Sequence, residues 1–161
     1  MKHRHILPLA LLAVLAGTAS AQSLSKGNVP ANRLVGVWKV DVAIGPCSLP
    51  NPVVFFSAYG TFHAGGTLSD TNWTAPTYRG PGQGVWAYQG NGQYASRFQF
   101  FRFDQASPAP ATGFNDVRVL ITLDAGGNGY SGVVNARQLD LAGNPVGPPL
   151  CGQAIGTRLG L

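Results

Sequence analysis

The sequence has little charge, and this narrows the classes of protein to consider. Only 11% of its 161 residues are charged, and glutamate does not occur at all. Such a composition disfavours helices, whose exposed positions are usually filled by charged residues. The basic residues stand singly among apolar neighbours, whereas a nucleic-acid-binding surface needs them clustered. We therefore expect no nucleic-acid partner.

Long hydrophobic runs are absent except at the N-terminus. The chain begins with basic residues, is apolar over residues 6–17 and then reads Ala19-Ser20-Ala21, a small-x-small pattern that signal peptidases accept. The apolar run of about a dozen residues is too short to cross a bilayer as a helix. The sequence predicts a signal peptide over residues 1–21, cleaved near Ala21, and a secreted or periplasmic protein without a membrane anchor. The mature chain keeps nine basic and six acidic residues, a formal net charge of +3.

Reactive side chains are scarce as well. His63 is the only histidine after the predicted signal peptide, and Cys47 and Cys151 are the only cysteines. Two cysteines in an exported chain favour a disulfide, so a zinc site or a catalytic cysteine lacks partners. The acid or base candidates are the aspartates, most of them outward on predicted strands or beside turns: Asp41, Asp70, Asp104, Asp116, Asp124 and Asp140. We expect no cofactor and no metal site, and we assign no catalytic residue.

Glycine and proline are plentiful, with 22 and 12 residues. They recur about every eight to twelve residues, with Val, Phe, Tyr and Thr between them, which is typical of all-β sandwiches and barrels. Apolar and polar residues alternate as in half-buried strands; Trp38 and Val40, for example, share one face and Lys39 lies on the other. We predict eight strands, over residues 34–42, 52–58, 61–68, 84–89, 93–104, 116–124, 129–139 and 148–158.

The fifth predicted strand contains one irregularity. Phe98 and Phe100 alternate with polar residues, but the apolar pattern then moves to Phe101 and Phe103. A β-bulge at positions 100 and 101 explains this shift and turns Arg102 toward solvent.

The connections between the predicted strands alternate in length. The first, third, fifth and seventh are long, whereas the others are tight turns at Tyr59-Gly60, 90–92 and 125–128. Successive connections of an up-and-down sheet lie at opposite ends, so loops gather at one rim and turns at the other. Eight twisted strands in this order tend to close, because closure removes the exposed edges. We predict one eight-stranded up-and-down antiparallel barrel over 34–161, preceded by an N-terminal extension over 22–33.

The cysteines indicate closure independently. Cys47 follows the first predicted strand, and Cys151 lies near the start of the last, both at the loop-rich rim. A disulfide between them joins neighbours only if the first and last strands pair, as a closed barrel requires.

A short motif in the first strand adds a family resemblance. Gly36-Val37-Trp38 resembles the Gly-x-Trp signature of lipocalins, and Arg158 resembles the basic residue that packs on that tryptophan. Antiparallel partners have residue numbers with a constant sum, which is 196 for Trp38 and Arg158 and 198 for the two cysteines, so both clues imply nearly one register. The resemblance implies a small, exported, bacterial-type lipocalin-like (calycin) barrel with structural roles for Trp38 and Arg158 and a mouth at the loop-rich rim. Avidins, and the allene oxide cyclase and dirigent group, have related barrels and remain alternatives.

The third long connection is the best candidate for a binding site. Its Trp73, Tyr78 and Arg79 offer two amphipathic rings and a fixed cation at the predicted mouth, suited to an aromatic, glycan or carboxylate group. Alternatively, the two rings simply plug this end of the barrel.

The predicted interior offers further candidate ligand contacts. Its large rings face small residues, which either leave a cavity or receive the rings so that the interior is full; we expect a filled or nearly filled core. The interior rings assigned as candidate contacts are Trp86, Tyr88, Tyr94 and Phe98.

These features favour an exported, non-catalytic protein that binds a small hydrophobic or aromatic molecule at the mouth. This hypothesis requires an apolar pocket beneath the connection that carries Trp73. One alternative is an interaction protein, such as an inhibitor of an extracellular enzyme, whose loop-rich rim contacts a protein partner. Another is a cofactor-free cyclase or isomerase, which predicts an aspartate or tyrosine buried in the cavity with a perturbed pKa.

Overall fold

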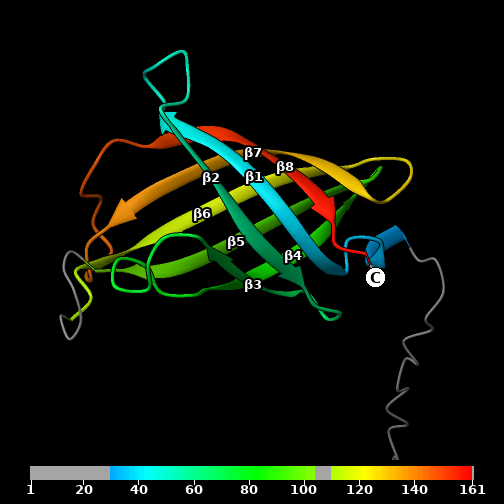
Figure 1. Cartoon of the computed structure of the whole chain (residues 1–161), viewed down its shortest axis with the longest axis horizontal. Coiled ribbons are helices and arrows are strands. Elements are labelled where there is room, and N and C mark those ends of the chain that lie inside the picture. Colours follow the sequence, from blue (N-terminus) through cyan, green and yellow to red (C-terminus); the bar gives the residue numbers. More distant parts are fainter. Residues whose placement is uncertain (1–29, 104–109, 161) are drawn as a thin grey trace, which may run out of the picture.

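The computed structural model describes residues 30–103 and 110–160, which form a closed barrel of antiparallel strands (Figure 1). The strands are β1 (Gly36–Pro46), β2 (Val54–Phe62), β3 (Thr67–Asn72), β4 (Gly82–Gly90), β5 (Gln93–Arg102), β6 (Gly113–Leu123), β7 (Gly129–Leu139) and β8 (Leu150–Arg158). Each strand pairs with the next along the chain, and β8 pairs with β1. A single 3-10 turn, η1 (Pro30–Asn32), precedes β1. The predicted all-β, up-and-down barrel is confirmed.

Helical structure is minimal in this part of the chain. Over residues 30–103 and 110–160, no helix has the length and apolar character needed to cross a membrane.

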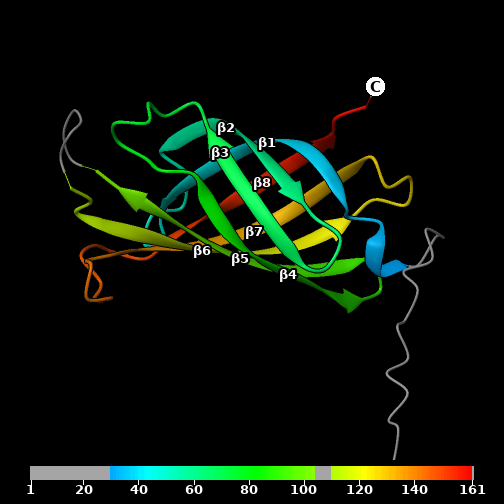
Figure 2. The same cartoon turned by 90° about the horizontal axis from the view of Figure 1, so that it is seen from below.

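The two ends of the barrel carry different connections, as predicted. The turns after β2, β4 and β6 gather at one end together with η1, and the longer connections after β1, β3, β5 and β7 lie at the other (Figures 1 and 2). We call these the turn end and the loop end. The strands also differ in length: β3, with six residues, is the shortest of the eight.

One predicted turn is wrong. Tyr59-Gly60 lies within β2, where both residues pair with β1. The chain turns instead at 63–66, where Gly65 and Gly66 adopt φ angles of +97° and +88°. Residues with a side chain rarely adopt these angles, so the glycine pair is the stronger turn signal.

The predicted bulge in the fifth strand is also wrong, because β5 pairs with β6 in unbroken register. Phe101 points outward and is exposed beside Gly80, whose N–H donates a hydrogen bond to the Phe101 carbonyl at 2.9 Å. Arg102 consequently lies on the inner side of the barrel with Phe98, where both residues line a cavity. Its predicted exposure to solvent is corrected.

A disulfide joins β1 and β8 at the loop end, as predicted. The Cα atoms of Cys47 and Cys151 are 4.8 Å apart, and the bond spans a sequence separation of 104. The chain-entropy model assigns up to about 4–5 kcal/mol to a crosslink of this span. β1 and β8 pair in the register that sets Trp38 opposite Arg158 and Gly45 opposite Cys151, so the cysteines are diagonal neighbours.

The turn end of the barrel is filled. Leu34, Trp38 and Tyr94 are almost completely buried, and the Trp38 ring packs against Tyr130 with centroids 5.0 Å apart. The Arg158 guanidinium lies 4.3 Å from the centre of the Trp38 ring, as a cation–π contact. Arg158 also donates hydrogen bonds to the backbone carbonyls of Arg33, Val35 and Gly127. These contacts tie the segment before β1 and the turn after β6 across the closed end.

Candidate functional site

The loop-end half of the barrel is hollow. It holds a cavity of about 360 Å³, and Ala58, Ala136 and Ala154 face this space with side chains too small to fill it. Larger apolar side chains complete the wall, among them Val40, Ile44, Phe56, Val117, Val134 and Leu150. The expectation of a filled core therefore holds at the turn end and is wrong at the loop end.

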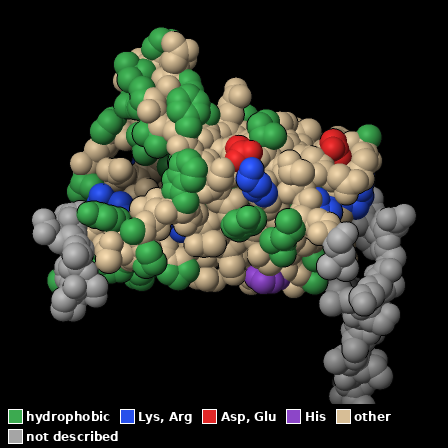
Figure 3. Space-filling view, in the orientation of Figure 1, with side chains coloured by type: hydrophobic (Ala, Val, Ile, Leu, Met, Phe, Trp, Pro, Cys, Tyr) green, Lys and Arg blue, Asp and Glu red, His purple; other side chains and the backbone are tan. Residues whose placement is uncertain are grey.

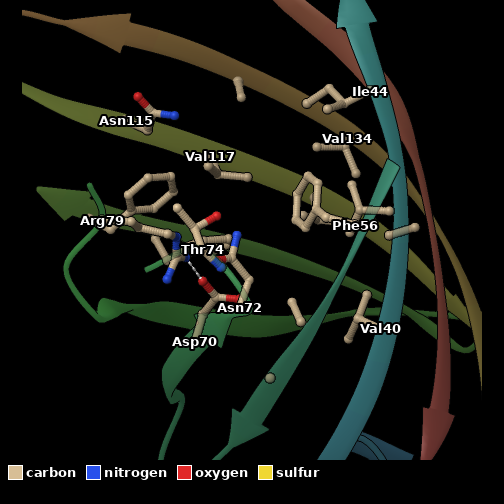
Figure 4. A pocket seen from close by; sticks show the side chains of 18 of the residues that line it. Val40, Ile44, Phe56, Asp70, Asn72, Thr74, Arg79, Asn115, Val117 and Val134 are labelled. Atoms are coloured by element: carbon tan, nitrogen blue, oxygen red, sulfur yellow. Dashed lines mark hydrogen bonds and ion pairs between the residues drawn. The ribbon is translucent and has the colours of Figure 1, made fainter. Parts of the chain in front are cut away.

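A polar patch interrupts this apolar wall on one side. It consists of Asp70 and Asn72 of β3, Thr74 and Arg79 of the connection after β3, Arg102 of β5 and Asn115 of β6. Figure 4 shows Asp70 and Arg79 across the cavity from Val40 and Val134. Such a chamber, mainly apolar with a few convergent polar groups, has the composition usual in small-molecule pockets.

Arg79 is held in the polar patch by contacts from several directions. The connection after β3 folds against β5, where an antiparallel bridge pairs Arg79 with Arg102. The Arg79 guanidinium lies 3.9 Å from the centre of the Phe100 ring, and it donates hydrogen bonds to the Asp70 carboxylate and to the Gly80 carbonyl. With 8% of its surface exposed, Arg79 belongs to the interior rather than to the rim.

Asp70 supplies the carboxylate of the polar patch. Its ion pair with Arg79 is buried, with 12% and 6% of the two side chains exposed. Burial raises the pKa of Asp70, and the Arg79 guanidinium lowers it by less, so the net direction is upward. Gly82 on the neighbouring strand leaves the necessary room, since a Cβ there would lie 3.0 Å from the Asp70 Cβ.

Three buried side-chain atoms in the described part of the chain have no hydrogen-bond partner: Arg79 Nε, Arg102 Nε and Asn115 Oδ1. All three residues belong to the polar patch. An unsatisfied buried polar atom costs about 1–3 kcal/mol, so such atoms are normally paired. Their concentration in one patch marks the part of the wall where buried polar groups outnumber the partners that the described residues supply.

Two aromatic side chains stand at the mouth of the cavity. Trp73 is 71% exposed and Tyr78 is 55% exposed, yet both line the opening. Phe55, at the start of β2, is another exposed ring there. Figure 3 shows that hydrophobic side chains also gather on the connection between β1 and β2, which rises above the barrel and contains the exposed Leu49 and Val53. A bound molecule would thus meet apolar surface before it enters.

The residues assigned to ligand contact from the sequence fall into two groups. Trp73, Tyr78, Arg79 and Phe98 line the cavity. Trp86, Tyr88 and Tyr94 do not line it; they form part of the aromatic cluster toward the turn end. In that cluster the Tyr94 ring lies 5.9 Å from the Trp86 ring and 5.1 Å from the Tyr88 ring, measured between centroids.

Four polar residues of the cavity are not among the predicted site residues: Asn72, Thr74, Arg102 and Asn115. The predicted bulge turns Arg102 toward solvent, whereas uninterrupted alternation with Phe98 and Phe100 places it inside. Asn115 lies before the predicted start of the sixth strand, whereas β6 begins at Gly113 and sets Asn115 opposite Phe100. Its inward position follows only from the longer strand.

His63 and Asp116, two further candidates for chemistry, lie outside the cavity. His63 is exposed, with Nε2 3.2 Å from the Ser69 hydroxyl. Asp116 is on the outer side of the barrel, where it accepts hydrogen bonds from Arg97 at 2.6 Å and from Gln99 at 3.1 Å. Asp104, considered above as an acid or base, lies outside the described residues.

The sequence matches no protein-family model and no curated protein. Function must therefore be inferred from the cavity and the groups that line it.

Proposed function

We propose that the protein binds a small, mainly hydrophobic or aromatic molecule inside the loop-end half of the barrel, as an exported binding protein of lipocalin-like type. The cavity carries this proposal. Its volume of about 360 Å³ lies within the roughly 300–1,000 Å³ usual for small-molecule sites. The apolar pocket required beneath the connection that carries Trp73 is present, and Trp73 lines it.

Export is part of the proposal and has two supports. Residues 1–21 have the basic start, short apolar core and small-residue end of a signal peptide. The Cys47–Cys151 disulfide is a bond that persists in oxidising compartments such as the periplasm or the extracellular space.

Binding is tested with N-phenyl-1-naphthylamine, a neutral probe whose fluorescence rises in apolar surroundings. We expect saturable binding to one site per chain. Ala136→Phe places a ring in the cavity and should abolish or strongly weaken binding. Ala87→Phe adds the same ring at an exposed position of β4 and should leave binding unchanged. No saturable binding, or equal binding by both variants, contradicts the proposal.

A cofactor-free cyclase or isomerase is the second candidate, and Asp70 favours it. Burial raises the pKa of this cavity carboxyl, and perturbed carboxyls in cavities are frequent acid–base catalysts. The test incubates the protein with a small-molecule extract of its host and searches by chromatography and mass spectrometry for products of unchanged mass. Asp70→Asn should stop their formation without lowering thermal stability. If the unmodified protein converts nothing, the catalytic candidate fails while binding stands.

A protein partner at the loop-rich rim stays a prediction. A solid interior would have favoured it over ligand binding, and the loop-end half of the barrel is hollow.

A further inference from the structure

The ionisable groups that line the cavity do not balance in charge. In the described wall, Asp70 is the carboxylate, and Arg79 and Arg102 are the guanidinium groups. Arg79 is paired with Asp70. For Arg102, the structure shows no carboxylate within 4 Å among residues 30–103 and 110–160. The polar patch therefore holds one more positive than negative charge when Asp70 is ionised.

The geometry directs this excess charge toward the cavity. Arg79 and Arg102 oppose each other across an antiparallel bridge, and directly opposed residues project their side chains to the same face of a sheet. Here that face is the interior, since both residues line the cavity. One terminal nitrogen of Arg102 donates a long hydrogen bond of 3.4 Å to the Leu139 carbonyl, and the Nε atom of Arg102 has no hydrogen-bond partner.

Two of the three unpartnered atoms are donors. Arg79 Nε and Arg102 Nε each carry a hydrogen, whereas Asn115 Oδ1 is an acceptor, and this side chain donates from its amide nitrogen. Donors next to an uncompensated cation are best met by an anionic oxygen, because charge-assisted hydrogen bonds are the stronger ones. Arginine suits a carboxylate in particular, since the planar fork and the two oxygens match.

The opposite wall carries no charged side chain among residues 30–103 and 110–160. Val40 of β1 and Val134 of β7 face the polar patch (Figure 4), and Ala154 of β8 lines the same cavity. A ligand that complements both walls has a charged end against the polar patch and an apolar body against the opposite wall.

From these observations we infer that the ligand is an amphipathic organic acid. Its carboxylate binds Arg102, with Arg79 and Asn115 as neighbouring donors, and its apolar part lies against β1, β7 and β8. This inference rests on the proposed binding function and names its ligand class. Asp70 has a defined place in it: by pairing with Arg79 it neutralises one cation, so that the cavity accepts a single negative charge.

The test uses three probes of equal chain length, decanoate, decan-1-ol and decylamine, as competitors of N-phenyl-1-naphthylamine at neutral pH. Decanoate should displace the dye at a concentration about tenfold or more below that of decan-1-ol, and decylamine should be the weakest. 2-Naphthoate and 2-acetonaphthone repeat the comparison of acid and neutral compound with an aromatic body. Tighter binding of decanoate than of 2-naphthoate would indicate a fatty acid as the ligand, and the reverse would indicate an aromatic acid.

Variants assign the effect to the polar patch. Arg102→Met should remove the preference for decanoate over decan-1-ol, whereas Arg137→Met, at an exposed position of β7, makes the same change in net charge and should preserve it. Asp70→Asn should increase the affinity for decanoate and leave that for decan-1-ol unchanged. If Arg102→Met does not fold, Asp70→Asn and the probe series on the unmodified protein still decide.

The outcomes separate the two proposals. Dye binding with equal displacement by acid and alcohol overturns the anionic ligand but keeps the binding function. Preferential displacement by decylamine also overturns it and identifies Asp70 as the binding group. A protein that binds neither the dye nor any competitor loses the proposed function and this inference together.

Discussion

The two halves of the barrel are built from the same strands but have opposite interiors. Toward the turn end, the Trp38 ring packs against Tyr130, and the buried Tyr94 ring packs against Trp86 and Tyr88. Toward the loop end, alanines and valines face a polar patch across open space. Eight strands enclose just enough volume for either result. The comparison teaches that the size of the inward side chains, and not the topology, decides whether a barrel is solid or hollow.

The two halves also differ in what they bury. The fully buried side chains of Leu34, Trp38 and Tyr94 lie toward the turn end, whereas the buried polar atoms without a partner belong to the polar patch of the loop end. Substitutions in each half test this division.

The largest effect is expected from removing the centre of the filled half. Trp38→Ala should lower the free energy of unfolding by about 4 kcal/mol, because it deletes a fully buried ring and leaves a void under Arg158. Phe56→Ala, in the wall of the cavity, should cost about half as much, since its ring already borders open space. Urea denaturation measures both. Equal losses would show that the two halves are packed alike.

The disulfide comes next, because it crosslinks the end of β1 to β8 at the rim of the hollow half. Replacing both Cys47 and Cys151 by alanine should lower the free energy of unfolding by about 3 kcal/mol. The measurement is chemical denaturation of the double variant beside the oxidised protein. A loss below about 1 kcal/mol would mean that the strand pairing of β1 and β8 suffices at the loop end.

Adding one methyl group at a glycine packed against a ring, and at a glycine that borders the cavity, probes the available space directly. A Cβ at Gly156 would overlap the Tyr130 ring, so Gly156→Ala should destabilise the protein by about 1–3 kcal/mol. A Cβ at Gly60 would lie 3.7 Å from Phe62 and 3.9 Å from Val40, which is ordinary contact, so Gly60→Ala should change stability by less than about 0.5 kcal/mol. Thermal unfolding of the two variants compares them, and an equal cost would remove the distinction.

The smallest effect concerns two aspartates that pair with arginine, Asp70 inside and Asp116 outside. Burial raises the pKa of Asp70 in the folded protein. Burial also acts upward on Asp116, but hydrogen bonds from Arg97 and Gln99 and the charges of nearby arginines outweigh it and lower the pKa. The two carboxyls should therefore give stability opposite dependences on pH.

The signs follow from which state loses its proton first. As pH rises through the ordinary aspartate value of 3.8, unfolded Asp70 ionises before folded Asp70, so stability falls until the folded group also ionises. The contribution of Asp116 is present above that value and is lost as pH falls through the lowered folded pKa. Both effects should be smaller than the losses expected from the substitutions above. Urea midpoints from pH 2 to 7 should lose the first slope in Asp70→Asn and the second in Asp116→Asn; unchanged profiles would contradict the assignment.

Much of the fold could be predicted from the sequence because strands leave periodic and local signals. The alternation around Trp38, the unequal connections and the two cysteines were enough for the strand order, the closure and the disulfide. The error at Tyr59-Gly60 arose because one glycine was read as a turn, while the Gly65-Gly66 pair carried the positive φ angles.

The site was harder to predict because a cavity is a property of facing side chains. Trp86, Tyr88 and Phe98 are all inward aromatic residues, yet only Phe98 borders the open space. Which of them does so depends on the strand tilt and on partners such as Ala136 across the barrel. The pairing of Asp70 with Arg79 required the connection after β3 to fold back inside, a path that no local pattern encodes.

The shortness of β3 has a consequence for how molecules enter and leave. Asp70 and Asn72 are carried by the strand with the fewest residues to hold it between its neighbours. Local opening concentrates where few hydrogen bonds must break together. We therefore expect the wall to open most often beside β3, which pairs at five positions with β2 and at four with β4, and such an opening would expose the polar patch sideways to solvent. The rate at which a bound molecule leaves the cavity would then depend on local opening beside β3 as well as on the aromatic side chains at the mouth.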